Sequence, residues 1–161
     1  MLSAAGSSRN RDPLVVFARG PRSLRRKRIR TLAEKISALV AGGGRFCCRL
    51  TDDAELRRLN REFLKHDYPT DVLSFPAPSP DGRLGDLAIS WERAREQARQ
   101  FSHPVETEIA ILILHGVLHL LGFDHSADHG RMARAERSWR EKLGLPTGLI
   151  ERAKPSRAPR A

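Results

Sequence analysis

The chain has 161 residues, which is the size of one ordinary domain built around a single hydrophobic core. Hydrophobic residues make up 40% of it and aromatic residues only 6%, so the core is expected to consist mainly of Leu, Ile, Val and Ala. No segment reaches the roughly 18–20 apolar residues needed to span a bilayer, which argues against a membrane protein. The formal net charge of +10 instead favours a polyanionic partner, nucleic acid above all.

The two ends of the chain differ in composition from its middle. Residues 1–11 are rich in Ser and Arg and contain no acidic residue, so we expect a disordered extension, with a transit peptide as the alternative. Residues 149–161 carry basic residues among prolines and cannot contribute to a core, so we expect a disordered basic tail. Residues 12–148 are predicted to form one domain.

The first half of this domain alternates between strand and helix signals. Residues 13–18 and 45–50 are rich in apolar and β-branched side chains and predict strands. Residues 21–40 predict a helix with a basic first turn, ended by three consecutive glycines. Residues 54–65 predict a second helix, which the polar segment 51–53 caps.

The second half begins with two strands and ends with three helices. Residues 70–75 and 84–90 predict strands that pair as a hairpin across an exposed loop at 76–82. Helices follow at 91–101, 105–121 and 127–143, and the apolar face of the middle one indicates that it lies in the core. This order predicts an α/β (α+β) fold, in which about five helices pack on one mixed four-stranded sheet.

Three histidines lie close together in the predicted central helix and the turn after it. His115 and His119 are four residues apart, so they project from the same helix face. Gly122 can end the helix and reverse the chain, which lets His125 approach the other two. Three imidazoles suit a tetrahedral divalent metal, most simply Zn²⁺, with one coordination position left open for catalysis. The pattern therefore favours a metal-dependent hydrolase.

A single histidine on an apolar helix face is more often a satisfied core residue than a metal ligand, but three at these spacings favour a site. His129 is expected to be a surface residue at the start of the next helix. If it were a fourth ligand, the site would be closed and its catalytic role less plausible. Nickel, copper and iron also accept imidazole ligands.

The histidine spacing resembles the zinc signature of metzincin proteases, with one difference. Those enzymes place a glutamate general base directly after the first histidine. Here that position is Gly116, which has no side chain to accept a proton. Peptide hydrolysis by that mechanism is therefore disfavoured.

Two further features concern the compartment and the partner. Cys47 and Cys48 are neighbours on a predicted strand and would point to opposite faces, so we expect two small buried residues and no disulfide, as in the reducing cytoplasm. Basic residues crowd the segment 22–30 and the C-terminal tail. Such runs are usually solvated, but two of them in one chain with a metal site favour contacts with a phosphate backbone.

Three ordered blocks between about residues 45 and 143 resemble the YbeY endoribonuclease family. The run 115–125 matches that family's signature HGxLHLxGxDH at every fixed position. Residues 59–63 (LNREF) with 67–76 (DYPTDVLSFP), and residues 84–90 (LGDLAIS), supply the other two blocks. The resemblance implies a small α/β domain in which His115, His119 and His125 bind one zinc ion. It also implies a single-strand-directed endoribonuclease acting in ribosomal RNA maturation and ribosome quality control, with ribosomal RNA and the ribosome as partners.

The chain departs from this family at one position of the second block. Many members carry an arginine after the aromatic residue of that block, where this chain has Leu64 followed by Lys65. An arginine can bind a phosphate through two parallel hydrogen bonds, which leucine cannot do. The substrate would then be contacted by Lys65, Arg61 or Ser74. Beside the catalytic pair His115 and His119, Asp124 would orient a histidine or transfer a proton, with an ordinary turn residue as the equal alternative.

Two other functions stay open at this stage. One is an RNA-binding ribosome assembly factor whose metal is mainly structural, and the other is a metal hydrolase of a different substrate. A His119→Ala substitution distinguishes the first from a nuclease, because loss of a structural zinc would unfold the protein. The sequence leaves open the RNA site cleaved, the choice between attack by water and attack by the ribose 2′-hydroxyl, and the oligomeric state.

Overall fold

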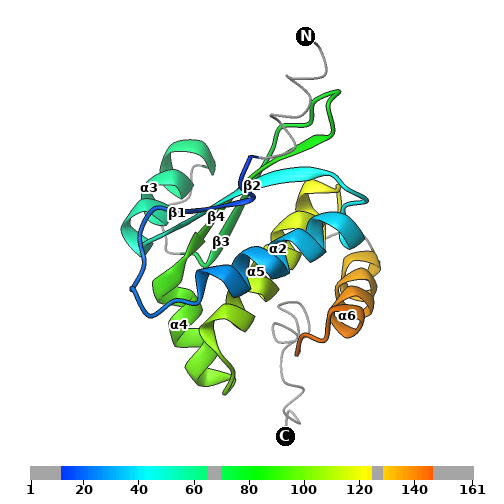
Figure 1. Cartoon of the computed structure of the whole chain (residues 1–161). Coiled ribbons are helices and arrows are strands. Elements are labelled where there is room, and N and C mark those ends of the chain that lie inside the picture. The colour runs from blue at the N-terminus through cyan, green and yellow to red at the C-terminus, as the bar shows by residue number, and fades with distance from the viewer. Residues whose placement is uncertain (1–11, 65–69, 125–128, 147–161) are drawn as a thin grey trace, which may run out of the picture.

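A computed structural model describes residues 12–64, 70–124 and 129–146 of the chain (Figure 1). The elements are β1 (Val15–Phe17), α2 (Arg26–Lys35), the π-helical segment η1 (Ile36–Val40), β2 (Arg45–Thr51), α3 (Asp53–Leu64), β3 (Val72–Pro76), β4 (Arg83–Ser90), α4 (Trp91–Gln100), α5 (Val105–Leu120) and α6 (Arg131–Leu143). The extensions predicted at 1–11 and 149–161 lie outside the described residues, so the domain limits stay a prediction.

Four strands form one mixed sheet in the order β1-β2-β4-β3. β1 runs parallel to β2, and β2 runs parallel to β4. β3 is antiparallel to β4 and forms the far edge, with Ser74 opposite Leu87. The predicted mixed sheet, the hairpin and the α/β fold class are confirmed.

Helices cover both faces of this sheet, and alternation along β4 decides which side chain points to which helix. Leu87 and Ile89 belong to the main core with α5 and α2, whereas Ala88 packs with Leu73 against Leu56 of α3. α5 is the central helix, as predicted. Of its sixteen residues only Val105 and His119 are not fully buried.

The predicted helix at 21–40 is wrong in its start and in its last turn. The helix begins at Arg26, because residues 21–24 form a turn that buries Leu24 and the Arg25 N–H donates to Glu106 Oε2 at 3.0 Å. The last five residues widen into η1, where the Ala41 N–H donates to the Ile36 carbonyl five residues back. The Ser37 hydroxyl also donates to the Gly44 carbonyl at 2.8 Å and draws the following turn against this segment.

The remaining boundaries lie close to their predicted positions. The Asp52 carboxylate accepts a hydrogen bond from the Glu55 N–H at 3.0 Å, which caps α3 as expected. The helix predicted at 127–143 is wrong in its start: it begins at Arg131, because His129 and Gly130 form a turn with positive φ angles. Residues 125–128 lie outside the described ranges. Cys48 is buried in the main core and Cys47 is half-buried, both with free thiols. Within the described ranges, every helix is too short or too polar to span a bilayer.

Candidate metal centre and active-site cleft

His115 and His119 occupy the last two turns of α5 and face the same way. Their ring centroids are 4.8 Å apart at an interplanar angle of 74°, and their Nε2 atoms are 3.2 Å apart. His115 is buried at 8% exposure, while His119 is half-buried and closer to solvent. Helical periodicity therefore brings two imidazole nitrogens to one point at the end of a buried helix, as the sequence predicts.

A glutamate that the sequence analysis missed lies behind the first histidine. The Nδ1 atom of His115 is 2.8 Å from Oε2 of Glu136 on α6, and this carboxylate is 1% exposed. A carboxylate oxygen can accept a hydrogen bond from a ring N–H, so this contact favours a hydrogen on Nδ1 and leaves Nε2 facing His119. The sequence signal that could have found Glu136 is its spacing: it lies four residues after Met132, so the two share one helix face, and they are the buried residues of α6.

The end of α5 turns the chain directly after the second histidine. The Gly122 N–H donates to the His119 carbonyl and the Phe123 N–H donates to the Leu118 carbonyl, each at 3.0 Å. Gly122 adopts φ 97°, a left-handed conformation that glycine reaches without strain. The predicted turn is confirmed up to Asp124, but His125 lies outside the described residues. Among the described ranges no set of three His, Cys, Asp or Glu residues forms a metal site, so the predicted triad stays a prediction.

His115 and His119 line a cleft of about 790 Å³ between the end of α5 and the edge strand β3. This volume is within the range of small-molecule sites. Its lining residues are Thr70, Asp71, Val72, Leu73, Ser74, Pro76, His115, His119, Gly122, Phe123 and Asp124. Ser74 and Asp124, which the sequence predicts at the substrate and beside the histidines, are among these lining residues.

The cleft has an acidic rather than a basic lining. Asp71, another residue that the sequence analysis missed, lies in it and accepts a hydrogen bond from Gln97 Nε2 at 3.0 Å. Asp124 supplies a second carboxylate, and no Lys or Arg within the described ranges lines the cleft. Two carboxylates beside two imidazoles suit a cation better than an unneutralised phosphate. Asp71 belongs to the sequence block DYPTDVLSFP, which was the signal that pointed to it.

Ser74 and Gly116 fix the contact between β3 and α5. The Ser74 hydroxyl donates to the Gly116 carbonyl at 3.2 Å. A Cβ atom on Gly116 would lie 2.7 Å from Leu87 Cδ2 and 3.3 Å from Ser74 Oγ. Glycine at this position thus allows the helix to approach the sheet, and a glutamate base of the metzincin kind has no room there.

The predicted substrate contact Arg61 does not meet the histidines. Arg61 is exposed on α3, which packs on the opposite face of the sheet from α5, and it does not line the cleft. Lys65 lies outside the described residues. His129 is exposed with φ 56°, and its carbonyl accepts a hydrogen bond from Arg134.

Comparison with known proteins identifies relatives over most of the chain. The sequence pattern of the family described as Endoribonuclease YbeY matches residues 22–144. The protein of that name from Solibacter usitatus is 59% identical over 152 residues, covering 94% of this chain and 98% of the relative. The protein of the same name from Koribacter versatilis is 53% identical over 103 residues, which cover 64% of this chain and 67% of the relative. The solution structure of TM1509 from Thermotoga maritima superposes with a TM-score of 0.56 at 27% identity, covering 80% of this chain and 88% of that one.

Proposed function

Because the chain belongs to the YbeY endoribonuclease family, and is thus an endoribonuclease that acts on RNA phosphodiester bonds, we propose that it cleaves single-stranded RNA with one zinc ion. His115, His119 and His125 would hold that ion. We further propose ribosomal RNA maturation and ribosome quality control as its role, with ribosomal RNA and the ribosome as partners in the cytoplasm. The free thiols of Cys47 and Cys48 support a reducing compartment.

The observation that carries the metal proposal is the distance between the two histidine nitrogens. Two nitrogens that each lie about 2.0–2.1 Å from a tetrahedral zinc are about 3.3 Å apart. The Nε2 atoms of His115 and His119 are 3.2 Å apart. The spacing of these two nitrogens supports a zinc site, and the Glu136 carboxylate supports it further by contacting the His115 ring.

Zinc held in this way would supply Lewis-acid stabilisation of a phosphoryl oxygen and would make water more acidic near neutral pH. The chain's own residues would do the rest. Glu136 orients His115, and Asp71, held by Gln97, presents a carboxylate to the cleft. We propose that Asp124, which lines the cleft beside the histidines, accepts or returns the proton during cleavage. Ser74 is engaged with the Gly116 carbonyl and therefore positions α5 against β3.

The direct test is cleavage of a single-stranded ribosomal RNA fragment by three proteins. These are the wild type, His119→Ala, and the matched control His129→Asn, which removes an exposed imidazole from a position where asparagine tolerates the positive φ. We expect His119→Ala to stay folded and lose cleavage, and His129→Asn to keep it. A His119→Ala protein that unfolds would favour a structural metal in an assembly factor. Loss of activity in His129→Asn would favour a fourth ligand.

Analysis of the product ends separates the two chemical routes. A 2′,3′-cyclic phosphate means that the ribose 2′-hydroxyl attacks the phosphorus. A plain phosphate end without a cyclic precursor means that water attacks directly.

A further inference from the structure

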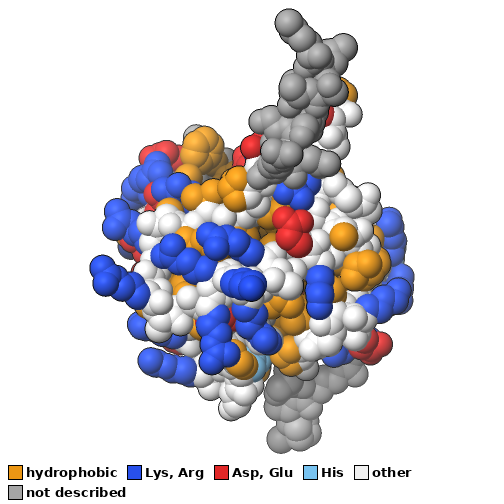
Figure 2. All heavy atoms as spheres, in the orientation of Figure 1, with side chains coloured by type: hydrophobic (Ala, Val, Ile, Leu, Met, Phe, Trp, Pro, Cys, Tyr) orange, Lys and Arg blue, Asp and Glu red, His pale blue; other side chains and the backbone are white. Residues whose placement is uncertain are grey.

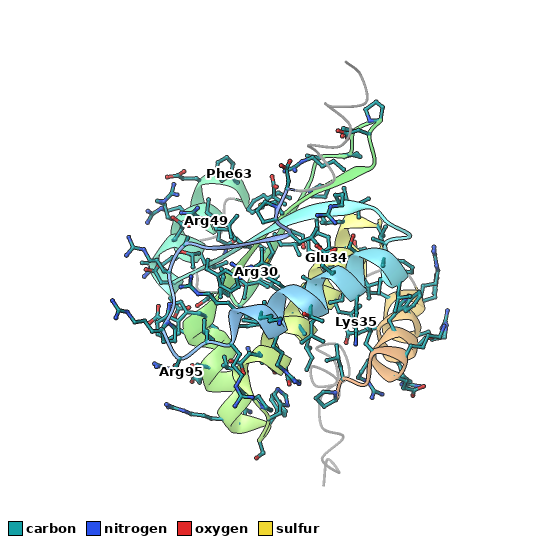
Figure 3. All side chains as sticks on the ribbon, viewed as in Figure 1. Arg30, Glu34, Lys35, Arg49, Phe63 and Arg95 are labelled. Carbon is teal, nitrogen blue, oxygen red and sulfur yellow. The ribbon has the colours of Figure 1, made fainter. Side chains whose placement is uncertain are left out.

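Six exposed cationic side chains cover the start of α2 and the segment before it. We call this region the basic surface; it consists of Arg22, Arg25, Arg26, Lys27, Arg28 and Arg30. Figure 2 shows Lys and Arg side chains gathered over this part of the molecule. Figure 3 places Arg30 on α2 near the middle of the same face, with Arg95 of α4 at its lower edge.

Several arginines of the protein pair with carboxylates, and the cations of the basic surface differ from these. Elsewhere Arg45 pairs with Glu34, Arg49 with Glu55, Arg58 with Glu62 and Arg93 with Asp53. Within the described ranges, none of the six side chains forms an ion pair. Their positive charge is therefore available to an external anion.

An aromatic ring holds two of these cations in place without neutralising them. The guanidinium carbons of Arg26 and Arg30 each lie 4.9 Å from the centroid of the Phe17 ring, which projects from the edge strand β1. The two arginines are four residues apart, about one helical turn of 5.4 Å. A cation–π contact leaves the N–H donors of a guanidinium free to bind phosphate oxygens.

The charge is not explained by the stability of α2. Its first turn contains no acidic residue, and its N-cap Arg25 makes no side-chain capping hydrogen bond. Cations at this end oppose the helix dipole and weaken the helix. A run of basic residues that destabilises its own helix is better explained by a binding role.

The basic surface also lies far from the histidines. The Arg25 N–H contacts Glu106 in the first turn of α5, thirteen residues before His119, which corresponds to about 20 Å along the helix. The cleft itself has no described Lys or Arg in its lining. Among the described residues, cationic contacts to a nucleic acid held in the cleft therefore have to come from outside it.

We propose that the basic surface binds the phosphate backbone of single-stranded RNA outside the segment being cleaved. This proposal rests on the proposed function, because it takes the occupant of the cleft to be RNA. The contacts are to phosphates and carry no base specificity.

The test is binding of a fully 2′-O-methylated RNA of ~60 nucleotides, measured by fluorescence anisotropy over a range of salt, with strand integrity checked on a denaturing gel. The variant is Arg26→Gln with Arg30→Gln. The control is Arg58→Gln with Arg83→Gln, which removes the same charge from two arginines that are ion-paired on the surface. We expect the first variant to bind about tenfold more weakly and to reduce the salt slope by about 1.4, or about 0.7 per lost phosphate contact. Its melting temperature should stay close to that of the wild type, because the lost cation–π contacts and the relief at the helix N-terminus act in opposite directions.

Equal weakening in the variant and the control would overturn the proposal, because net charge alone would then explain binding. Unchanged binding in the variant would also overturn it. If the Arg26→Gln, Arg30→Gln variant loses binding to vesicles of phosphatidylglycerol and phosphatidylcholine but still binds RNA, the surface would be assigned to lipid phosphates instead. Since the readout is binding, a wild-type protein that never cleaves RNA would contradict the proposed function and leave this test intact.

Discussion

The carboxylate of Glu136 on α6 holds the imidazole of His115 on α5, with 2.8 Å between Oε2 and Nδ1. Both groups are buried, so the contact gives each a polar partner that is shielded from water. The contact joins two helices that are separated by the turn through Asp124, and it fixes the direction in which His115 presents Nε2. It is the arrangement expected behind a metal-ligating histidine.

Glu136→Gln tests this relationship. The amide keeps the size of the side chain but loses the charge that supports the imidazole, so we expect zinc affinity to fall about 10–100-fold. The measurement is a competition titration against a zinc chelator. Glu141→Gln, which changes a well-exposed glutamate of the same helix, is the matched control and should bind zinc as the wild type does. Equal zinc affinity in Glu136→Gln and the wild type would remove Glu136 from the metal centre.

Gly116→Ala tests the close approach of α5 to the sheet. The new Cβ would lie 2.7 Å from Cδ2 of Leu87, which is 1% exposed and has little room to move. Overpacking of this kind costs about 1–3 kcal/mol of unfolding free energy, measurable by urea denaturation. The double variant Gly116→Ala with Leu87→Val should lose less unfolding free energy than the sum of the losses in the two single variants. Strictly additive effects would show that the two residues are not in steric conflict.

The two thiols should react slowly with alkylating reagents. Burial raises the pKa of Cys48, and burial with a smaller contribution from Asp86 raises the pKa of Cys47. A raised pKa lowers the thiolate fraction at a given pH, and the thiolate is the reactive form. At about pH 8.5 we expect Cys48 to be labelled only as the protein unfolds, and Cys47 more slowly than a free thiol. Mass spectrometry after iodoacetamide treatment would measure both; labelling of Cys48 at the rate of the unfolded chain would contradict its burial.

Glu55 should make part of the stability dependent on acid pH. Its hydrogen bond with Arg49 lowers the pKa of Glu55 below 4.5. The unfolded chain therefore binds a proton more readily than the folded one, so this stabilisation is present above pH 4.5 and is lost as the pH falls through the lowered pKa. Urea denaturation of the wild type and of Glu55→Gln should converge in acid and differ at neutral pH. A constant difference across this range would show that the ion pair contributes nothing.

The parts of the fold that sequence could predict are those set by local pattern. The hairpin of β3 and β4, the buried helix α5 and the shared face of His115 and His119 all follow from residue spacing. The late start of α2 could not be predicted, because it depends on a hydrogen bond from Arg25 to Glu106, 81 residues away. Glu136 was missed for the same reason, since its partner His115 is on another helix. Arg61 was expected near the substrate because of its position in a sequence block, but α3 packs on the far face of the sheet.

The most direct test of the account is the zinc content of the purified protein, measured by mass spectrometry of the metal in the wild type and in His119→Ala. We predict about one zinc per wild-type chain and a large loss in a His119→Ala protein that keeps its circular dichroism spectrum. A folded His119→Ala protein that retains the full zinc content would contradict a metal centre built on the two Nε2 atoms at the end of α5.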